Sequence, residues 1–123
     1  MRLGAMILLM TLLGASATLA GQTRDENWKR CLDSNPDLSI GGCTALIQAG
    51  QENDSNLAKA FRNRGIAYDD KGEYDRAIQD YDQSIRINPN FADAYSSRGS
   101  AYDDKGDYDR ALQDYAQALP RLE

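Results

Sequence analysis

The 123-residue chain contains no histidine, and it has only two cysteines. Histidine is the commonest general base and the commonest transition-metal ligand, so its absence counts against catalysis and against a transition-metal site. Basic residues are also scarce, at 14 against 19 acidic ones, which gives a net charge of −5. This balance argues against nucleic acids and anionic membrane surfaces as partners. We therefore expect a small, single-domain protein that is not an enzyme and needs no cofactor.

A long apolar run occurs only at the N-terminus. Arg2 precedes a largely apolar stretch, Leu3–Leu13, and small residues follow it. This pattern is typical of a secretory signal peptide. We predict a signal peptide at 1–20, cleaved after Ala17 or Ala20, and an exported protein that is periplasmic or secreted and keeps no stable membrane anchor after cleavage. An uncleaved anchor is the alternative, because the segment is just long enough to be considered.

The strongest pattern in the chain is an internal repeat. The segment "AFRNRGIAYDDKGEYDRAIQDYDQSI", starting at Ala60, recurs as "AYSSRGSAYDDKGDYDRALQDYAQAL", starting at Ala94, with an offset of 34 residues. Self-similarity at such a period is typical of solenoids, in which stacked repeats bury a continuous core.

Each copy predicts two helices. The first runs from about Leu57 to Asp70, with cap candidates at 53–55, and 71–72 forms the turn. Apolar residues then recur at helical spacing until Pro89 ends the second helix. These apolar residues are Tyr74, Ala77, Ile78, Tyr81 and Ile85 in one copy and Tyr108, Ala111, Leu112, Tyr115 and Leu119 in the next.

The spacing of conserved-looking aromatic and small residues resembles the tetratricopeptide repeat (TPR) family. The residues that carry the resemblance are Phe61, Gly65, Tyr68, Ala77, Tyr81 and Pro89, followed by Tyr95, Gly99, Tyr102, Ala111 and Tyr115. The resemblance implies an all-α, helix–turn–helix solenoid with clear repeats at 56–90 and 91–123, and with the repeat tyrosines mainly in the core. Arg64 and Arg98 depart from the family, which usually has Leu there; we expect their alkyl stems to cover apolar surface while the charge reaches water. Pro120 should end the last helix early.

The same resemblance bears on the two cysteines. With the 34-residue offset, Cys31 corresponds to Gly65 and Cys43 to Ala77. In the TPR family these positions lie where the two helices of a hairpin approach most closely, so the resemblance implies a disulfide across a degenerate first hairpin at 24–55. An oxidising compartment also favours pairing. A redox role and two free thiols are the alternatives.

Two glycines are expected to weaken this first hairpin. Gly41 and Gly42 lie in or at the edge of its second helix, where each costs about 1 kcal/mol relative to Ala. A disulfide that closes so short a loop contributes roughly 3 kcal/mol, which is enough to offset them.

The resemblance also implies a concave groove, lined by the first helices of successive repeats, that holds an extended peptide or a partner helix. The groove residues implied by position are Lys59, Arg62, Ile66, Asp69, Asp70, Asp93, Ser96, Ser100, Asp103 and Asp104. The family's lysine–asparagine clamp for a C-terminal carboxylate is replaced by serines and Asp93, so we do not expect that clamp. The acidic stretch predicts a basic or neutral protein or peptide as partner; for any single residue, an ordinary solvated surface is the alternative.

The aspartate pairs 69–70 and 103–104 raise the question of a metal. A calcium loop needs closely spaced oxygen ligands ending in a glutamate. These pairs instead fall at predicted helix C-termini, so we interpret them as solvated helix ends and expect no metal site.

The last helix suggests a second function. Leu112, Tyr115 and Leu119 form an apolar stripe that could pack against a second copy as a twofold homodimer. The favoured function is a noncatalytic adaptor or scaffold that binds another exported or envelope protein in the groove. The alternative is a self-associating structural module.

Overall fold

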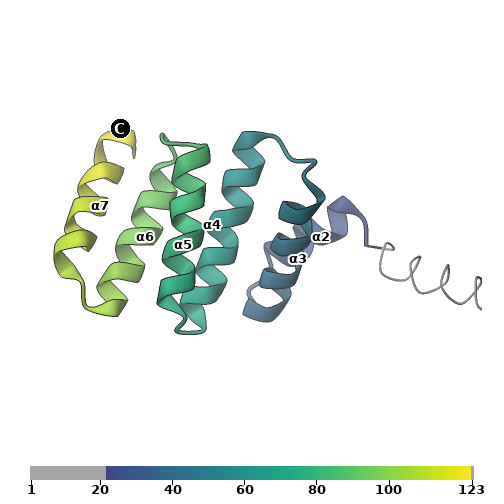
Figure 1. Cartoon of the computed structure of the whole chain (residues 1–123), viewed down its shortest axis with the longest axis horizontal. Coiled ribbons are helices and arrows are strands. Elements are labelled where there is room, and N and C mark those ends of the chain that lie inside the picture. Colours follow the sequence, from purple (N-terminus) through teal and green to yellow (C-terminus); the bar gives the residue numbers. More distant parts are fainter. Residues whose placement is uncertain (1–21, 123) are drawn as a thin grey trace, which may run out of the picture.

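The computed structural model describes residues 22–122, and the predicted signal peptide lies outside them. The described residues form six helices and no strand, which confirms the predicted all-α fold. The helices pair as three antiparallel hairpins that stand side by side in one row (Figure 1). The hairpins consist of α2 (Arg24–Cys31) and α3 (Pro36–Ala49), α4 (Asp54–Asp70) and α5 (Tyr74–Ile87), and α6 (Ala92–Lys105) and α7 (Tyr108–Leu122).

The helix ends follow from local capping chemistry. Thr23 and Glu26 form a reciprocal capping box at the start of α2, in which each side chain accepts a hydrogen bond from the other's backbone N–H. The side chain of Asn53 accepts a hydrogen bond from the backbone N–H of Asn56, so α4 begins three residues before the predicted Leu57. Gly50 ends α3 in the left-handed conformation, with φ of 65°.

The prediction that Pro120 ends the last helix early was wrong. Helix α7 continues through Pro120 to Leu122. A proline inside a helix removes one backbone hydrogen bond and crowds the preceding turn. Here only two helical residues follow it, so the cost falls on the final turn, where helix ends are already short of hydrogen bonds.

Small residues allow the two helices of each complete repeat to pack closely. A Cβ atom added to Gly65 would lie 2.6 Å from Cε1 of Tyr81, and one added to Gly99 would lie 2.7 Å from Cε1 of Tyr115. Tyr81 is almost fully buried there, as predicted for the repeat tyrosines. Tyr108 differs, because its side chain is exposed on the outer face of α7.

The prediction that the charges of Arg64 and Arg98 reach water was wrong, because both guanidinium groups are paired with carboxylates. The guanidinium of Arg64 donates two hydrogen bonds of 2.8 Å to the carboxylate of Asp80 and one of 3.2 Å to Thr44 Oγ1. Arg98 repeats the arrangement with Asp114 and adds a 2.8 Å contact to Asp82. Because each guanidinium bonds its own hairpin and the preceding one, the charge cross-links neighbouring repeats.

Candidate functional site

The first hairpin is joined by the disulfide that the sequence analysis predicted. Cys31, at the end of α2, is bonded to Cys43, in the middle of α3, with their Cα atoms 4.5 Å apart. Both cysteines are buried, and Ser39 Oγ donates a 2.7 Å hydrogen bond to the Cys31 carbonyl oxygen. Cys31 and Ser39 also line one of the two hollows described below, so the disulfide fixes part of the wall of the candidate site.

The two glycines of α3 have different roles, which the sequence analysis did not separate. A Cβ atom on Gly42 would lie 2.5 Å from both the Asn27 carbonyl oxygen and the Cys31 backbone nitrogen. A Cβ atom on Gly41 would meet only the end of the flexible Arg30 side chain. Gly42 is therefore required for the close approach of α2 and α3, rather than being only a weak point in a helix.

A buried glutamate that the sequence analysis missed holds α2 in place. The side chain of Glu52, in the loop before α4, is only 2% exposed. It accepts two 2.8 Å hydrogen bonds from Arg24 and one from Trp28 Nε1. These bonds keep the pKa of Glu52 below its ordinary value, chiefly through Arg24. The contact fixes the indole of Trp28, which lines the groove described next.

The groove contains a hollow of about 330 Å³ between α2, α4 and the start of α6, which we call the anchor pocket. Its apolar wall comes from Trp28, Leu32 and Phe91. Lys59, Arg62 and Asp93, all predicted groove residues, also line it, together with Asn56 and Asn63. The Arg62 guanidinium lies over the Phe91 ring at 5.9 Å and donates a 3.0 Å hydrogen bond to Ser97 Oγ, so Arg62 is held in position.

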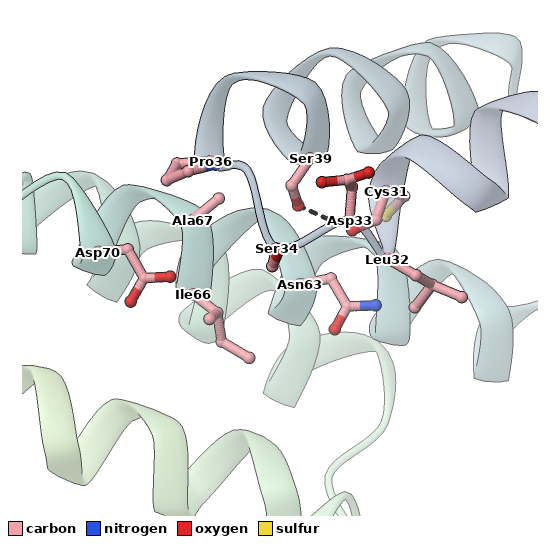
Figure 2. Close-up of a pocket in the computed structure, with 10 residues that line it drawn as sticks. All are labelled: Cys31, Leu32, Asp33, Ser34, Pro36, Ser39, Asn63, Ile66, Ala67 and Asp70. Atoms are coloured by element: carbon pink, nitrogen blue, oxygen red, sulfur yellow. Dashed lines mark hydrogen bonds between the residues drawn. The ribbon is translucent and has the colours of Figure 1, made fainter.

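A second hollow of about 250 Å³ continues along the same helix, and we call it the turn pocket (Figure 2). Ile66 and Asp70, two further predicted groove residues, line it from α4. Leu32 and Asn63 line both hollows, so the pockets adjoin. Sequence reasoning missed the contribution of the turn, Asp33 to Pro36.

Four carboxylates gather where α4 and α6 end, and we call this group the acidic end: Asp69, Asp70, Asp103 and Asp104. The pKa of Asp69 is raised to about 6, first by burial and then by the neighbouring Asp104 and Asp70. Asp69 and Asp104 come from successive repeats. Asp69 Oδ1 is buried and has no hydrogen-bond partner among the described residues.

The lysines that follow these aspartates in sequence do not neutralise them. Lys71 Nζ lies 2.6 Å from Asp37 of α3, and Lys105 Nζ lies 2.6 Å from Asp75 of α5. Within residues 22–120, none of the four carboxylates of the acidic end takes part in an ion pair. Among these residues, no ion pair therefore compensates their negative charge.

The remaining predicted groove residues lie outside the two pockets. Ser96 is half-buried and Ser100 is exposed. Asp103 is exposed at the acidic end without lining either hollow.

The predicted self-association stripe is only partly exposed. Leu112 and Leu119 are 67% and 64% exposed on α7. Tyr115 instead packs against Gly99 and belongs largely to the hairpin core. Tyr108, also 64% exposed, takes its place on the outer surface.

Neither a metal site nor a membrane span is found in the part of the chain that the structure describes. No three cysteine or carboxylate side chains there are placed to hold a metal ion together. None of the helices described is both long and apolar enough to cross a bilayer.

The stacked antiparallel hairpins, with two adjoining hollows along α4, define a helical-repeat protein. A family model of the TPR repeat matches residues 65–106, and a second, of the tetratricopeptide repeat, matches residues 92–121. Residues 65–121 therefore match tetratricopeptide repeats, as the sequence predicted. Repeats of this family generally bind other proteins and are generally noncatalytic.

Solved structures of MamA have the same fold. One crystal structure of MamA is 27% identical, with a TM-score of 0.70, over 86% of this chain and 62% of MamA. Another is 28% identical, with a TM-score of 0.69, over 85% of this chain and 57% of that one. A third structure, "MamA MSR-1 C2", has a TM-score of 0.71 at 19% identity and shows the fold alone. The chain thus spans less than two thirds of the first two structures. The comparison with curated proteins found no match.

Proposed function

We propose that this chain is a noncatalytic adaptor that binds a segment of another protein in its concave groove. The observation that carries the proposal is the pair of adjoining hollows along α4, which share Leu32 and Asn63. Trp28, Leu32 and Phe91 give one of them an apolar wall, and such walls are typical of binding pockets. The Glu52 contact and the disulfide hold this wall rigid, which lowers the entropic cost of binding.

The proposed partner is an exported or envelope protein. The apolar N-terminal segment with its small-residue ending supports export. The disulfide supports the same compartment, because disulfides persist mainly in oxidising environments.

Site-specific photo-crosslinking in the native host tests the groove. A photoreactive residue replaces Ile66, which lines the turn pocket, or Gln79, which is exposed on α5 and lines neither hollow. We expect a covalent adduct with one foreign protein from position 66 and none from position 79. Equal adducts from both positions, or none from position 66, would contradict the proposal.

A second candidate function, self-association through α7, is favoured by one observation. Tyr108, Leu112 and Leu119 are exposed on the outer surface of this helix. Ala116 occupies the place where the preceding repeat has Asp82, the residue that pairs with Arg98 of the next hairpin. The outer face of α7 thus lacks one of the charges that join α5 to α6, and it suits an apolar partner such as a second α7.

Light scattering tests this second candidate. We expect the wild-type protein to be a dimer at high concentration and the double variant Leu112→Lys/Leu119→Lys to be a monomer. A matched Gln79→Lys variant should remain dimeric. A wild-type protein that stays monomeric would exclude self-association.

A further inference from the structure

We infer that the groove selects an extended peptide carrying one large apolar side chain and, about three residues away, one or two Lys or Arg residues. This inference rests on the proposed function and specifies its ligand. The apolar side chain would occupy the anchor pocket, and the basic residues would lie against the acidic end.

The anchor pocket fits one large apolar side chain. Its volume of about 330 Å³ is at the lower end of the range for ligand pockets, about 300–1,000 Å³. Trp28 and Phe91 are held in place by Glu52 and Arg62, so the apolar wall is preorganised. Leu32, at 67% exposure, leaves apolar area uncovered that a ligand would bury. Lys59 and Arg62 with Asp93 give the lining of this pocket two positive charges and one negative charge, in contrast to the acidic end.

The acidic end differs from the apolar anchor pocket, because it presents negatively charged side chains. Asp69 and Asp104 repel each other across two repeats, and Lys71 and Lys105 are engaged with other carboxylates. A Lys or Arg from a ligand would relieve this repulsion. It would also supply a hydrogen-bond donor close to Asp69 Oδ1, which is buried and has no hydrogen-bond partner among the residues described. Uncompensated charge of one sign at one end of a groove favours a ligand with the opposite charge at that place.

The spacing between the two features follows from helix geometry. Arg62, at the anchor pocket, and Asp69 lie seven positions apart on α4. At about 1.5 Å per residue, the helix places them roughly 10 Å apart along its axis. An extended peptide covers that distance in about three residues, at roughly 3.3 Å each.

Selection from a displayed library of random dodecapeptides, with the mature protein as bait, tests the inference. Enriched peptides are then synthesised with capped ends, and their affinities are measured by calorimetry and by the fluorescence of Trp28, the only tryptophan in the chain. The consensus should contain an aromatic or large aliphatic residue with Lys or Arg about three positions away. Replacing the basic residues by Glu should weaken binding at least tenfold.

Matched protein variants locate the two contacts. The double variant Asp69→Asn/Asp104→Asn should bind the selected peptides with about tenfold lower affinity. The control Asp25→Asn/Asp109→Asn, which makes the same charge change at exposed first-turn positions of α2 and α7, should leave affinity unchanged. Leu32→Ser, on the rim of the anchor pocket, should lower the affinity for peptides that retain the apolar residue. It should not change the affinity for peptides that lack this residue.

An acidic consensus, no enrichment, or equal affinity for Asp69→Asn/Asp104→Asn and the control would overturn the inference. These outcomes are separable from failure of the proposed function, because the Ile66 crosslink does not depend on ligand charge. If position 66 gives an adduct but binding does not depend on ligand charge, the proposed adaptor function stands and the inferred basic peptide is refuted. If position 66 gives no adduct, both the proposed function and the inferred ligand are refuted.

Discussion

Arg64 of α4 is joined to Asp80 of α5 by two parallel hydrogen bonds, and the same pair recurs one repeat later as Arg98 and Asp114. The Arg64 side chain is 19% exposed and the Asp80 side chain 7%, so the charges are largely withdrawn from water. A planar guanidinium that meets a carboxylate in this way fixes the relative position of two helices. The pair thus takes the place of a leucine contact between the helices of one hairpin.

Removing one member of this pair should cost more than removing both. Asp80→Ala leaves a largely buried guanidinium without its carboxylate, and we expect a loss of about 3 kcal/mol in the free energy of unfolding. The double variant Arg64→Met/Asp80→Leu should retain most of the wild-type stability, because it leaves no uncompensated charge. Urea denaturation at pH 7 measures both. A double variant that loses as much stability as Asp80→Ala, or more, would contradict the interpretation.

The two glycines of α3 should respond oppositely to alanine. Gly42→Ala forces a methyl group against the backbone of α2, and we expect a loss of about 1–3 kcal/mol. Gly41→Ala meets only the end of the long Arg30 side chain, which can shift, so it should gain up to about 1 kcal/mol from better helix propensity. Thermal melts of the two variants form a matched comparison. Similar effects would show that Gly42 is not needed for the close approach.

The disulfide should stabilise the first hairpin. Closing a loop of this length contributes roughly 3 kcal/mol, mainly by restricting the unfolded chain. Reduction, or Cys31→Ala/Cys43→Ala, should lower the melting temperature by at least several degrees. An unchanged melt of fully reduced protein would exclude the stabilising role.

The acidic end should make stability depend on pH. The pKa of Asp69 rises from 3.8 to about 6 on folding, so between these values the native state binds the proton more tightly than the unfolded state. The contribution of Asp69 to stability therefore falls as pH rises through this window. Asp69→Asn should raise the melting temperature at pH 7.5 relative to wild type and have little effect at pH 4.5. The control Asp109→Asn should show no such difference, and an equal Asp69→Asn effect at both pH values would contradict the assignment.

The 34-residue offset explains why much of the site could be predicted. It places Lys59, Arg62, Ile66 and Asp70 on one face of α4, where four residues at helical spacing necessarily share a surface. It also aligned the cysteines with the small positions of the later repeats. Both predictions combined the period of the repeat with the resemblance to the TPR family.

The rest depends on contacts that no periodic pattern encodes. Glu52 lies in a loop and reaches Arg24, 28 positions away. The paired charges of Arg64 and Asp80 become predictable only when the crossing of α4 and α5 is known. The turn between α2 and α3 has no counterpart among the residues of the family motif, so its place in the site could not be carried over.

Hydrogen exchange of the protein, alone and with the partner captured at position 66, tests the central claim most directly. The account predicts slower exchange at the backbone amides of the turn, residues 32–35, with little change in α7. Protection confined to α7, with the turn unaffected, would contradict groove binding and point instead to association through the outer helix.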